Sequence, residues 1–135
     1  MGKIDGMIRF LNYKVTKVEY QLNTDFVWGE ETIDVKMNTE SESSVSEDGK
    51  KMIVTLTLRI FDDEQQKYPF RMIVEIQGAF VLVNDEQEEN IQKYYANALS
   101  ILYPYARAVV STYTANANIE PLILPTVNIW KMLNL

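Results

Sequence analysis

The sequence predicts an α+β fold, in which a four-stranded antiparallel sheet, arranged as a meander, has C-terminal helices packed on one face. Two observations carry this prediction. Through the first two-thirds of the chain, apolar and polar residues alternate with the period of two that marks a half-buried strand. Beyond residue 84 the apolar residues recur at helical spacing. Strands followed by helices, rather than alternating with them, indicate separate layers.

The first two strands are predicted over residues 16–22 and 32–37, where apolar side chains occupy every second position. Residues 11–15 are apolar in the opposite phase. Because a strand keeps one phase along a regular stretch, a bulge or break is expected between Tyr13 and Thr16.

A polar stretch, residues 41–50, is predicted to be a solvated loop with a turn at Asp48-Gly49. The third strand follows over residues 51–61, with an apolar side chain at every second position from Met52 to Ile60. These side chains are expected to face the core.

The fourth strand, residues 68–83, is apolar on both faces, because Ile73, Ala79 and Val81 lie opposite its main apolar row. Such a strand needs cover on both sides, and part of that cover could come from another subunit. Gly78, in its middle, indicates a bend, a bulge or a close backbone approach.

The helical part is predicted to begin at a capping box formed by Asn84 and Gln87 and to run through residues 91–99. A second helical segment is expected to start near Ser100. Pro104 would then lie near the first turn, where a missing amide hydrogen costs little. Prolines make residues 119–128 extended, and a last short helix is expected over 129–135.

Composition excludes several classes of function. The chain has 135 residues, no cysteine and no histidine, so the usual metal ligands and acid–base residues are missing. A net charge of −6 argues against nucleic-acid binding. No apolar run is long enough to insert in a membrane, and no signal peptide is recognisable. We expect a single cytoplasmic domain, 1–135, that is not an enzyme and binds no metal or cofactor.

Large apolar residues outside the regular elements give the positive signal. Trp28, Phe70, Trp130 and Met132 lie in loop-like stretches or at strand and chain ends. Each alone is most simply a core residue, but together they favour an adaptable apolar groove. The alternatives are a binding protein for a small hydrophobic ligand in a closed pocket and, least favoured, a carboxylate enzyme.

Two proline-bearing motifs identify a family. The stretches "ILYPYAR" (101–107) and "PLILPTVN" (121–128) resemble, in order and separation, two motifs of the protein-export chaperone SecB. The resemblance implies an ATP-independent holdase without a cofactor, assembled as a homotetramer (a dimer of dimers). It also implies that unfolded polypeptides or preproteins bind in an apolar groove and are delivered to the motor SecA.

The resemblance also implies which residues form the two surfaces. Carried over by position, the client-binding groove would contain Trp28, Phe70, Phe80, Leu122, Leu124, Ile129 and Leu133. The oligomer interface would contain Met72, Val74, Ile76, Tyr105 and Val109.

The sequence departs from the family where SecA would bind. Lys17, Gln21, Arg71 and Ile73 stand at the positions of an acidic docking patch, and the sequence ends at Leu135, without the family's acidic tail. These departures put SecA as a partner in doubt. The resemblance then leaves, as an alternative, a SecB-like chaperone dedicated to one client, such as the antitoxin of a toxin–antitoxin–chaperone system.

Overall fold

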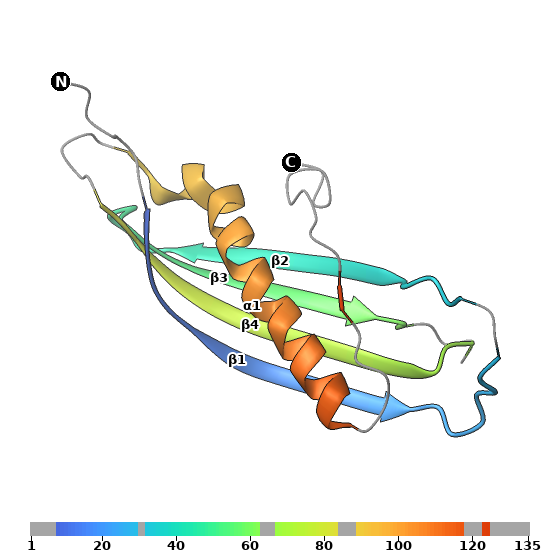
Figure 1. Cartoon of the computed structure of the whole chain (residues 1–135). Helices are drawn as coiled ribbons and strands as arrows, with labels where there is room; N and C mark the ends of the chain where they lie inside the picture. Colours follow the sequence, from blue (N-terminus) through green and yellow to red (C-terminus); the bar gives the residue numbers. More distant parts are fainter. Residues whose placement is uncertain (1–7, 30–31, 63–66, 84–88, 118–122, 125–135) are drawn as a thin grey trace.

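A computed structural model of the chain describes residues 8–29, 32–62, 67–83, 89–117 and 123–124. Four strands form one antiparallel sheet, and a long helix lies across one of its faces (Figure 1). The elements are β1 (Ile8–Leu22), β2 (Met37–Val45), β3 (Lys51–Ile60), β4 (Phe70–Leu82), the 3-10 helix η1 (Ile91–Tyr94) and α1 (Tyr95–Asn116).

The predicted fold class is confirmed, although the strand order differs from a plain meander. The order across the sheet is β1-β4-β3-β2, so β1 pairs with β4 and lies at the edge opposite β2. Strands β2, β3 and β4 neighbour one another in chain order, and β1 lies beside β4. This is a Greek-key arrangement. Alternation could not reveal this, because it shows which face a residue occupies and not which strand it pairs with. The chain between β1 and β2 (23–36) therefore connects opposite edges of the sheet.

Strand β1 keeps its pairing with β4 over its whole length by means of two irregularities. The register shifts between Phe10 and Asn12 and again between Val15 and Lys17. The second shift falls at the C-terminal end of the predicted break, which is thus confirmed as a bulge. Each extra residue returns the following apolar residues to the helix-covered face.

Strand β2 corrects the predicted boundaries. Residues 41–45, predicted as a loop, are strand, whereas residues 32–36 precede it. Serine and threonine side chains of β2 face inward, where the Tyr95 hydroxyl donates to Ser41 Oγ and Ser43 Oγ donates to Gln92 Oε1 at 2.9 Å. The sequence suggested a loop because these inward positions are polar. They can lie in a strand because hydrogen bonds satisfy them. The turn itself is confirmed, with Gly49 at φ +72°.

The core lies between the sheet and α1. The apolar rows of β3 and β4 are fully buried there, together with Leu99, Leu102 and Val110 of the helix. An added Cβ at Gly78 would lie 2.5 Å from Leu102 Cδ2, so the glycine permits a close approach of α1, which was one of the three alternatives offered for it. Within the described residues, no helix is long and apolar enough to cross a membrane.

Helix α1 is continuous where two segments were predicted. It runs through Pro104, which lies in its interior rather than near its first turn. Proline has no amide hydrogen, so the Ser100 carbonyl loses its helical hydrogen bond. Ser100 and Pro104 are both exposed, so water can donate to that carbonyl instead. Asn90 caps η1 by accepting from the Gln92 amide at 2.9 Å. The predicted cap at Asn84 and the predicted last helix lie outside the described residues.

Candidate functional site

A cavity that we call the sheet-end pocket lies where β1 ends and β4 begins. It encloses about 590 Å³. Its apolar lining comes from both sides of the β3–β4 connection and from the end of β1, and its polar rim from the chain that follows β1. The lining residues are Gln21, Leu22, Asn23, Thr24, Asp25, Phe61, Asp62, Tyr68, Phe70 and Arg71.

Aromatic contacts fix the floor of the sheet-end pocket. Phe61 stacks on Tyr68 with ring centroids 4.7 Å apart and meets Phe70 edge-on at 5.2 Å. Phe61 has φ +53°, a left-handed conformation that costs an aromatic residue about 1–3 kcal/mol. Its amide donates to the Lys36 carbonyl at 2.9 Å. Stacking and this hydrogen bond hold a backbone conformation that the residue alone disfavours.

The aromatic cluster continues from the pocket toward α1. Tyr20 lies 5.6 Å from Phe70 and 5.2 Å from Tyr113, measured between ring centroids. Its hydroxyl is buried and has no hydrogen-bond partner among the described residues. Burial, and next the neighbouring Tyr113, raise the pKa of Tyr20. The hydroxyl therefore stays neutral and keeps an unused donor beside the cluster.

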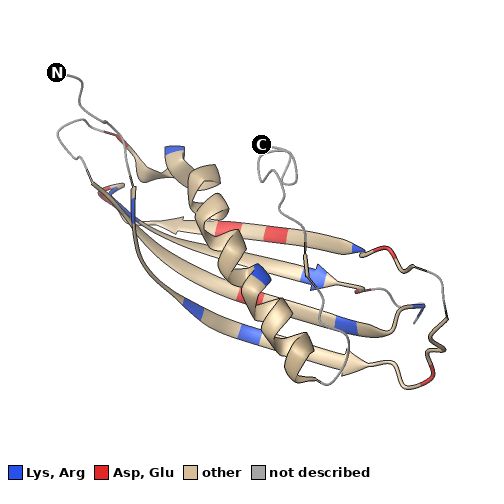
Figure 2. Cartoon of the chain, in the orientation of Figure 1, with Lys and Arg blue, Asp and Glu red and all other residues tan. Residues whose placement is uncertain are grey.

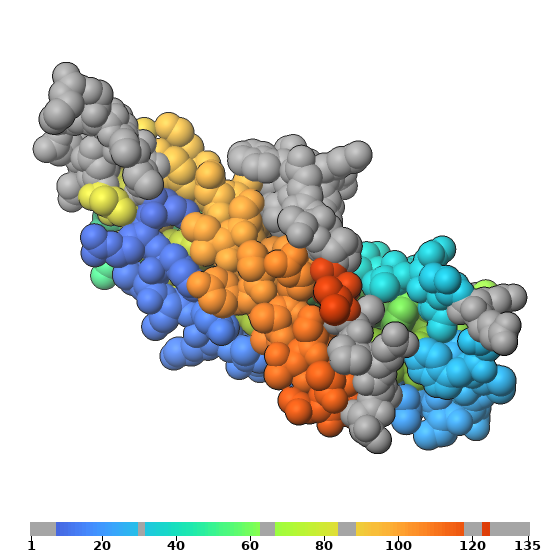
Figure 3. Space-filling view, in the orientation of Figure 1, coloured from blue at the N-terminus to red at the C-terminus, as the bar shows by residue number. Residues whose placement is uncertain are grey.

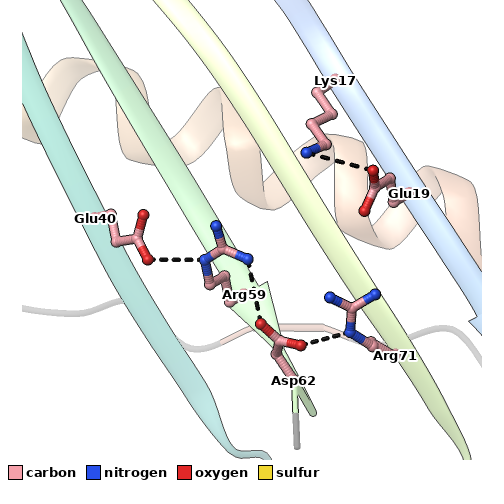
Figure 4. A network of polar contacts seen from close by, with 6 residues as sticks. All are labelled: Lys17, Glu19, Glu40, Arg59, Asp62 and Arg71. Carbon is pink, nitrogen blue, oxygen red and sulfur yellow. Dashed lines mark hydrogen bonds and ion pairs between the residues drawn. The ribbon is translucent and has the colours of Figure 1, made fainter.

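A polar network covers the opposite face of the sheet, which we call the open face because α1 lies on the other side (Figure 4). Asp62 accepts from Arg71 Nε and, at 3.2 Å, from Arg59 Nη1, and Arg59 Nε also donates to Glu40 at 2.8 Å. Ile73 is paired with Arg59 in the register and lies two residues from Arg71 on the same strand, and it is only 2% exposed. Long arginine side chains can bury apolar surface along their aliphatic stems while the charged group stays in water.

We expect Asp62→Asn to lower the free energy of unfolding by about 1 kcal/mol at neutral pH, since it removes charge from two arginine contacts. The Arg71 hydrogen bond, followed by the other arginine contacts, holds the pKa of Asp62 below its ordinary 3.8. The unfolded state therefore binds more protons near that pH. The contribution of the Asp62 carboxylate to the free energy of unfolding is complete above pH 3.8 and is lost as the pH falls through the lowered pKa of the folded state.

Urea unfolding at a series of pH values measures this prediction. The difference between the native protein and Asp62→Asn should shrink as the pH falls below 3.8. A difference that persists unchanged in acid would show that the carboxylate charge is not its cause.

The structure separates the predicted groove residues. Phe70 lies buried in the sheet-end pocket. Phe80, ten residues along the same strand, is about 33 Å away at 3.3 Å per residue, and it packs against Phe10 at 5.3 Å in the core. Trp28, 55% exposed, lies on the chain that follows β1, with its ring edge-on to Phe26 at 5.3 Å.

The C-terminal segment is described at two residues only, which lie beside α1 (Figure 3). Leu124 is buried in the core, whereas Ile123 is 77% exposed. Leu124 therefore attaches this segment to the sheet. The other predicted groove residues, Leu122, Ile129 and Leu133, lie outside the described residues.

Sequence reasoning missed Phe61, Tyr68 and Leu22, which complete the apolar lining. A signal was available, because Phe61 and Tyr68 flank the same short polar connection. A hairpin brings such flanking residues together at the end of a sheet.

The residues predicted for the oligomer interface differ in exposure. Met72, Val74 and Ile76 have no exposed surface in the single chain because they lie under α1. Both faces of β4 are apolar, and the sequence did not show which one the helix covers. Tyr105 is exposed and lies 4.5 Å from Tyr13 of β1, ring to ring, whereas Val109 is half-buried.

An antiparallel sheet with one long helix on one face and a pocket at its end defines a class of small α+β proteins. Within that class, a family model described as preprotein translocase subunit SecB matches residues 18–134. The chain belongs to the SecB family, as its two proline motifs predicted. Membership places it among chaperones rather than enzymes, which confirms the expectation that it is not an enzyme.

Individual relatives support this assignment. An uncharacterized protein of Methanocaldococcus jannaschii, MJ0357, is 33% identical over 93% of this chain and 82% of its own length. The protein-export protein SecB of Alcanivorax borkumensis is 25% identical, and that of Neorickettsia sennetsu 28%, each over 71% of this chain. The chain spans 61% and 62% of the length of these two proteins.

Two solved structures share the fold. The Mycobacterium tuberculosis SecB-like chaperone Rv1957, solved in complex with a ChAD peptide from the Rv1956 HigA1 antitoxin, superposes with a TM-score of 0.67 at 16% identity, covering 90% of this chain and 88% of Rv1957. A protein of unknown function from Streptococcus agalactiae gives 0.51 at 15% identity, covering 90% and 98%.

Proposed function

We propose that the chain is an ATP-independent holdase that binds unfolded polypeptides, with the sheet-end pocket as part of its client-binding groove. The observation that carries this proposal is the pocket itself. Its aromatic floor is bordered by a chain on which Trp28 stands exposed, while Leu22 and Ile123 also present apolar surface to solvent. Exposed apolar surface of this kind marks a site that another molecule covers.

The lining explains how such a site would accept many sequences. Burial of apolar client side chains contributes about 25 cal/mol per Å² without demanding a particular order of residues. Around the floor, Asn23, Asp25 and Arg71 supply polar groups at the rim. These groups could satisfy the backbone of an extended client, which would otherwise lose hydrogen bonds to water.

The open face supports a function without SecA. Lys17, Gln21 and Arg71 lie on it and Ile73 is buried beside them, so the positions of the family's acidic SecA-docking patch carry basic, polar and apolar residues here. This favours a chaperone dedicated to one client. Rv1957, a SecB-like chaperone, was solved with an antitoxin peptide. An antitoxin is therefore the client class to test first.

The small-ligand alternative has less support. A lipid-like molecule needs an apolar cavity, yet six of the ten lining residues of the sheet-end pocket are polar or charged. Binding of a fatty acid with loss of client binding would favour it.

For assembly we keep the proposal of a homotetramer, with its subunit contacts moved to the β1 edge and α1. Apolar side chains lie exposed there, from Leu11, Tyr13 and Val15 on the strand to Tyr105 and Tyr113 on the helix. An edge strand with apolar neighbours is a template for pairing with another chain.

The function is tested by light scattering. A stoichiometric amount of the protein should suppress aggregation of a chemically unfolded client in the absence of ATP, and bovine serum albumin should not. If scattering rises equally with both proteins, the holdase proposal is wrong. Repetition with ATP should change nothing.

A further inference from the structure

The two edges of the open face carry opposite charge. Lys14 and Lys17 lie on β1, whereas Glu40 and Glu42 lie on β2 at the other edge. Figure 2 shows basic segments on β1 and acidic segments on β2. Among the described residues, neither Lys14 nor Glu42 has an ion-pair partner, whereas Lys17 pairs with Glu19 of the same strand at 3.3 Å and Glu40 pairs with Arg59 at 2.8 Å. The sheet therefore has a basic edge and an acidic edge on a face that α1 does not cover.

The strand register places these charges in matching rows. Lys14 and Glu42 are the two ends of one row across the sheet, and Lys17 and Glu40 are the ends of the next. The rows run Lys14, Gln77, Thr55, Glu42 and Lys17, Glu75, Thr57, Glu40. Each row is thus basic at β1 and acidic at β2.

A neighbouring row is apolar and hollow. Ile53 of β3 is 43% exposed and lies directly opposite Ala79 of β4. A shallow trough of about 270 Å³ lies here, with Leu11 and Val81 also in its lining. A projecting isoleucine and a recess over an alanine therefore stand side by side.

A two-fold axis parallel to the strands makes this face complementary to itself. That rotation sets β1 over the partner's β2 and β4 over the partner's β3. Lys14 then faces Glu42 of the partner subunit, Lys17 faces the partner's Glu40, and Ile53 faces the partner's Ala79. A two-fold axis across the strands would instead set each edge against its like-charged copy.

We infer that the open face binds a second copy of this chain in this orientation. Sheets pack face to face about 10 Å apart with nearly aligned strands, a spacing that lysine and glutamate side chains span. At about 4.8 Å per strand and 3.3 Å per residue the face offers roughly 600 Å² per copy, which is less than a standard interface. The pairing is therefore weak, concentration-dependent and sensitive to salt.

Sedimentation velocity over a concentration series tests the charges. Lys14→Glu and Glu42→Lys should each weaken association about tenfold or more, because each sets like charges together at two symmetric places. The double variant Lys14→Glu/Glu42→Lys should restore it. Lys67→Glu, which makes the same charge change outside these strands, should leave it unaltered.

A second variant tests the apolar contact. Ile53→Glu should abolish the association, while circular dichroism and urea unfolding confirm that the variant folds. The mass that remains in Ile53→Glu reports any assembly through β1 and α1, and suppression of client aggregation should be unchanged. The inference is wrong if the native protein, Lys14→Glu and Ile53→Glu sediment with the same mass. It is also wrong if the double variant fails to restore association. Neither outcome depends on whether the protein acts as a holdase.

Discussion

Replacing Leu102 with alanine is expected to lower the free energy of unfolding by about 3–5 kcal/mol, the upper part of the range for a buried leucine. Leu102 has no exposed surface and lies directly over Gly78, at the closest approach of α1 to β4. Because the glycine has no side chain to fill the space, the cavity would persist. Such a loss is a large fraction of the total stability of a domain.

A double-mutant cycle tests the cause. Gly78→Ala alone should destabilise by about 1–3 kcal/mol, since its Cβ would lie 2.5 Å from Leu102 Cδ2. In the Leu102→Ala background the same methyl group enters the cavity. The destabilisation of the double variant should therefore be smaller than the sum of the two single-variant values by about 1 kcal/mol or more. Ile101→Ala, at a half-buried neighbour, should cost about 1 kcal/mol.

Urea unfolding of the four proteins gives the cycle. Strict additivity would mean that Leu102 and Gly78 do not share the space between helix and sheet. The close approach would then have another explanation.

The parts of the fold that followed from the sequence are those that a local period determines. The buried rows of β3 and β4 are as predicted, and the close approach at Gly78 is one of the three alternatives offered for it. The pairing of β1 with β4 depends instead on contacts between distant residues, which alternation does not record. The extent of β2 depends on hydrogen bonds from Tyr95 and Gln92 to its serines, so its polar residues looked like a loop.

The site followed from the sequence only in part, for the same reason. Family resemblance led to Phe70, which lies in the sheet-end pocket. Phe61 and Tyr68 join it only because a hairpin closes between them, and that geometry is not periodic. The burial of Met72, Val74 and Ile76 under α1 did not follow from the sequence either, because a strand with two apolar faces gives no sign of which face the helix covers.

Phe70→Ala is expected to weaken binding of an unfolded polypeptide about 30-fold, because buried aromatic anchors in binding pockets contribute about 2 kcal/mol or more. The phenyl ring forms the floor of the sheet-end pocket and holds Phe61 and Tyr20 through ring contacts at 5.2 and 5.6 Å. Its removal would take apolar surface from the client and loosen the neighbouring rings.

Phe80→Ala is the matched control, because Phe80 lies on the same strand and the same face and is also buried, yet packs far from the pocket. Both changes should lower the free energy of unfolding by about 3–5 kcal/mol. Client affinity is therefore measured, by fluorescence anisotropy with a labelled unfolded client, under conditions in which both variants are folded. Phe70→Leu and Phe80→Leu replace them if either alanine variant unfolds. Only the Phe70 variants should lose affinity. Equal losses at both positions would show that client binding follows stability or a groove along the whole strand, and would remove the sheet-end pocket as the anchor.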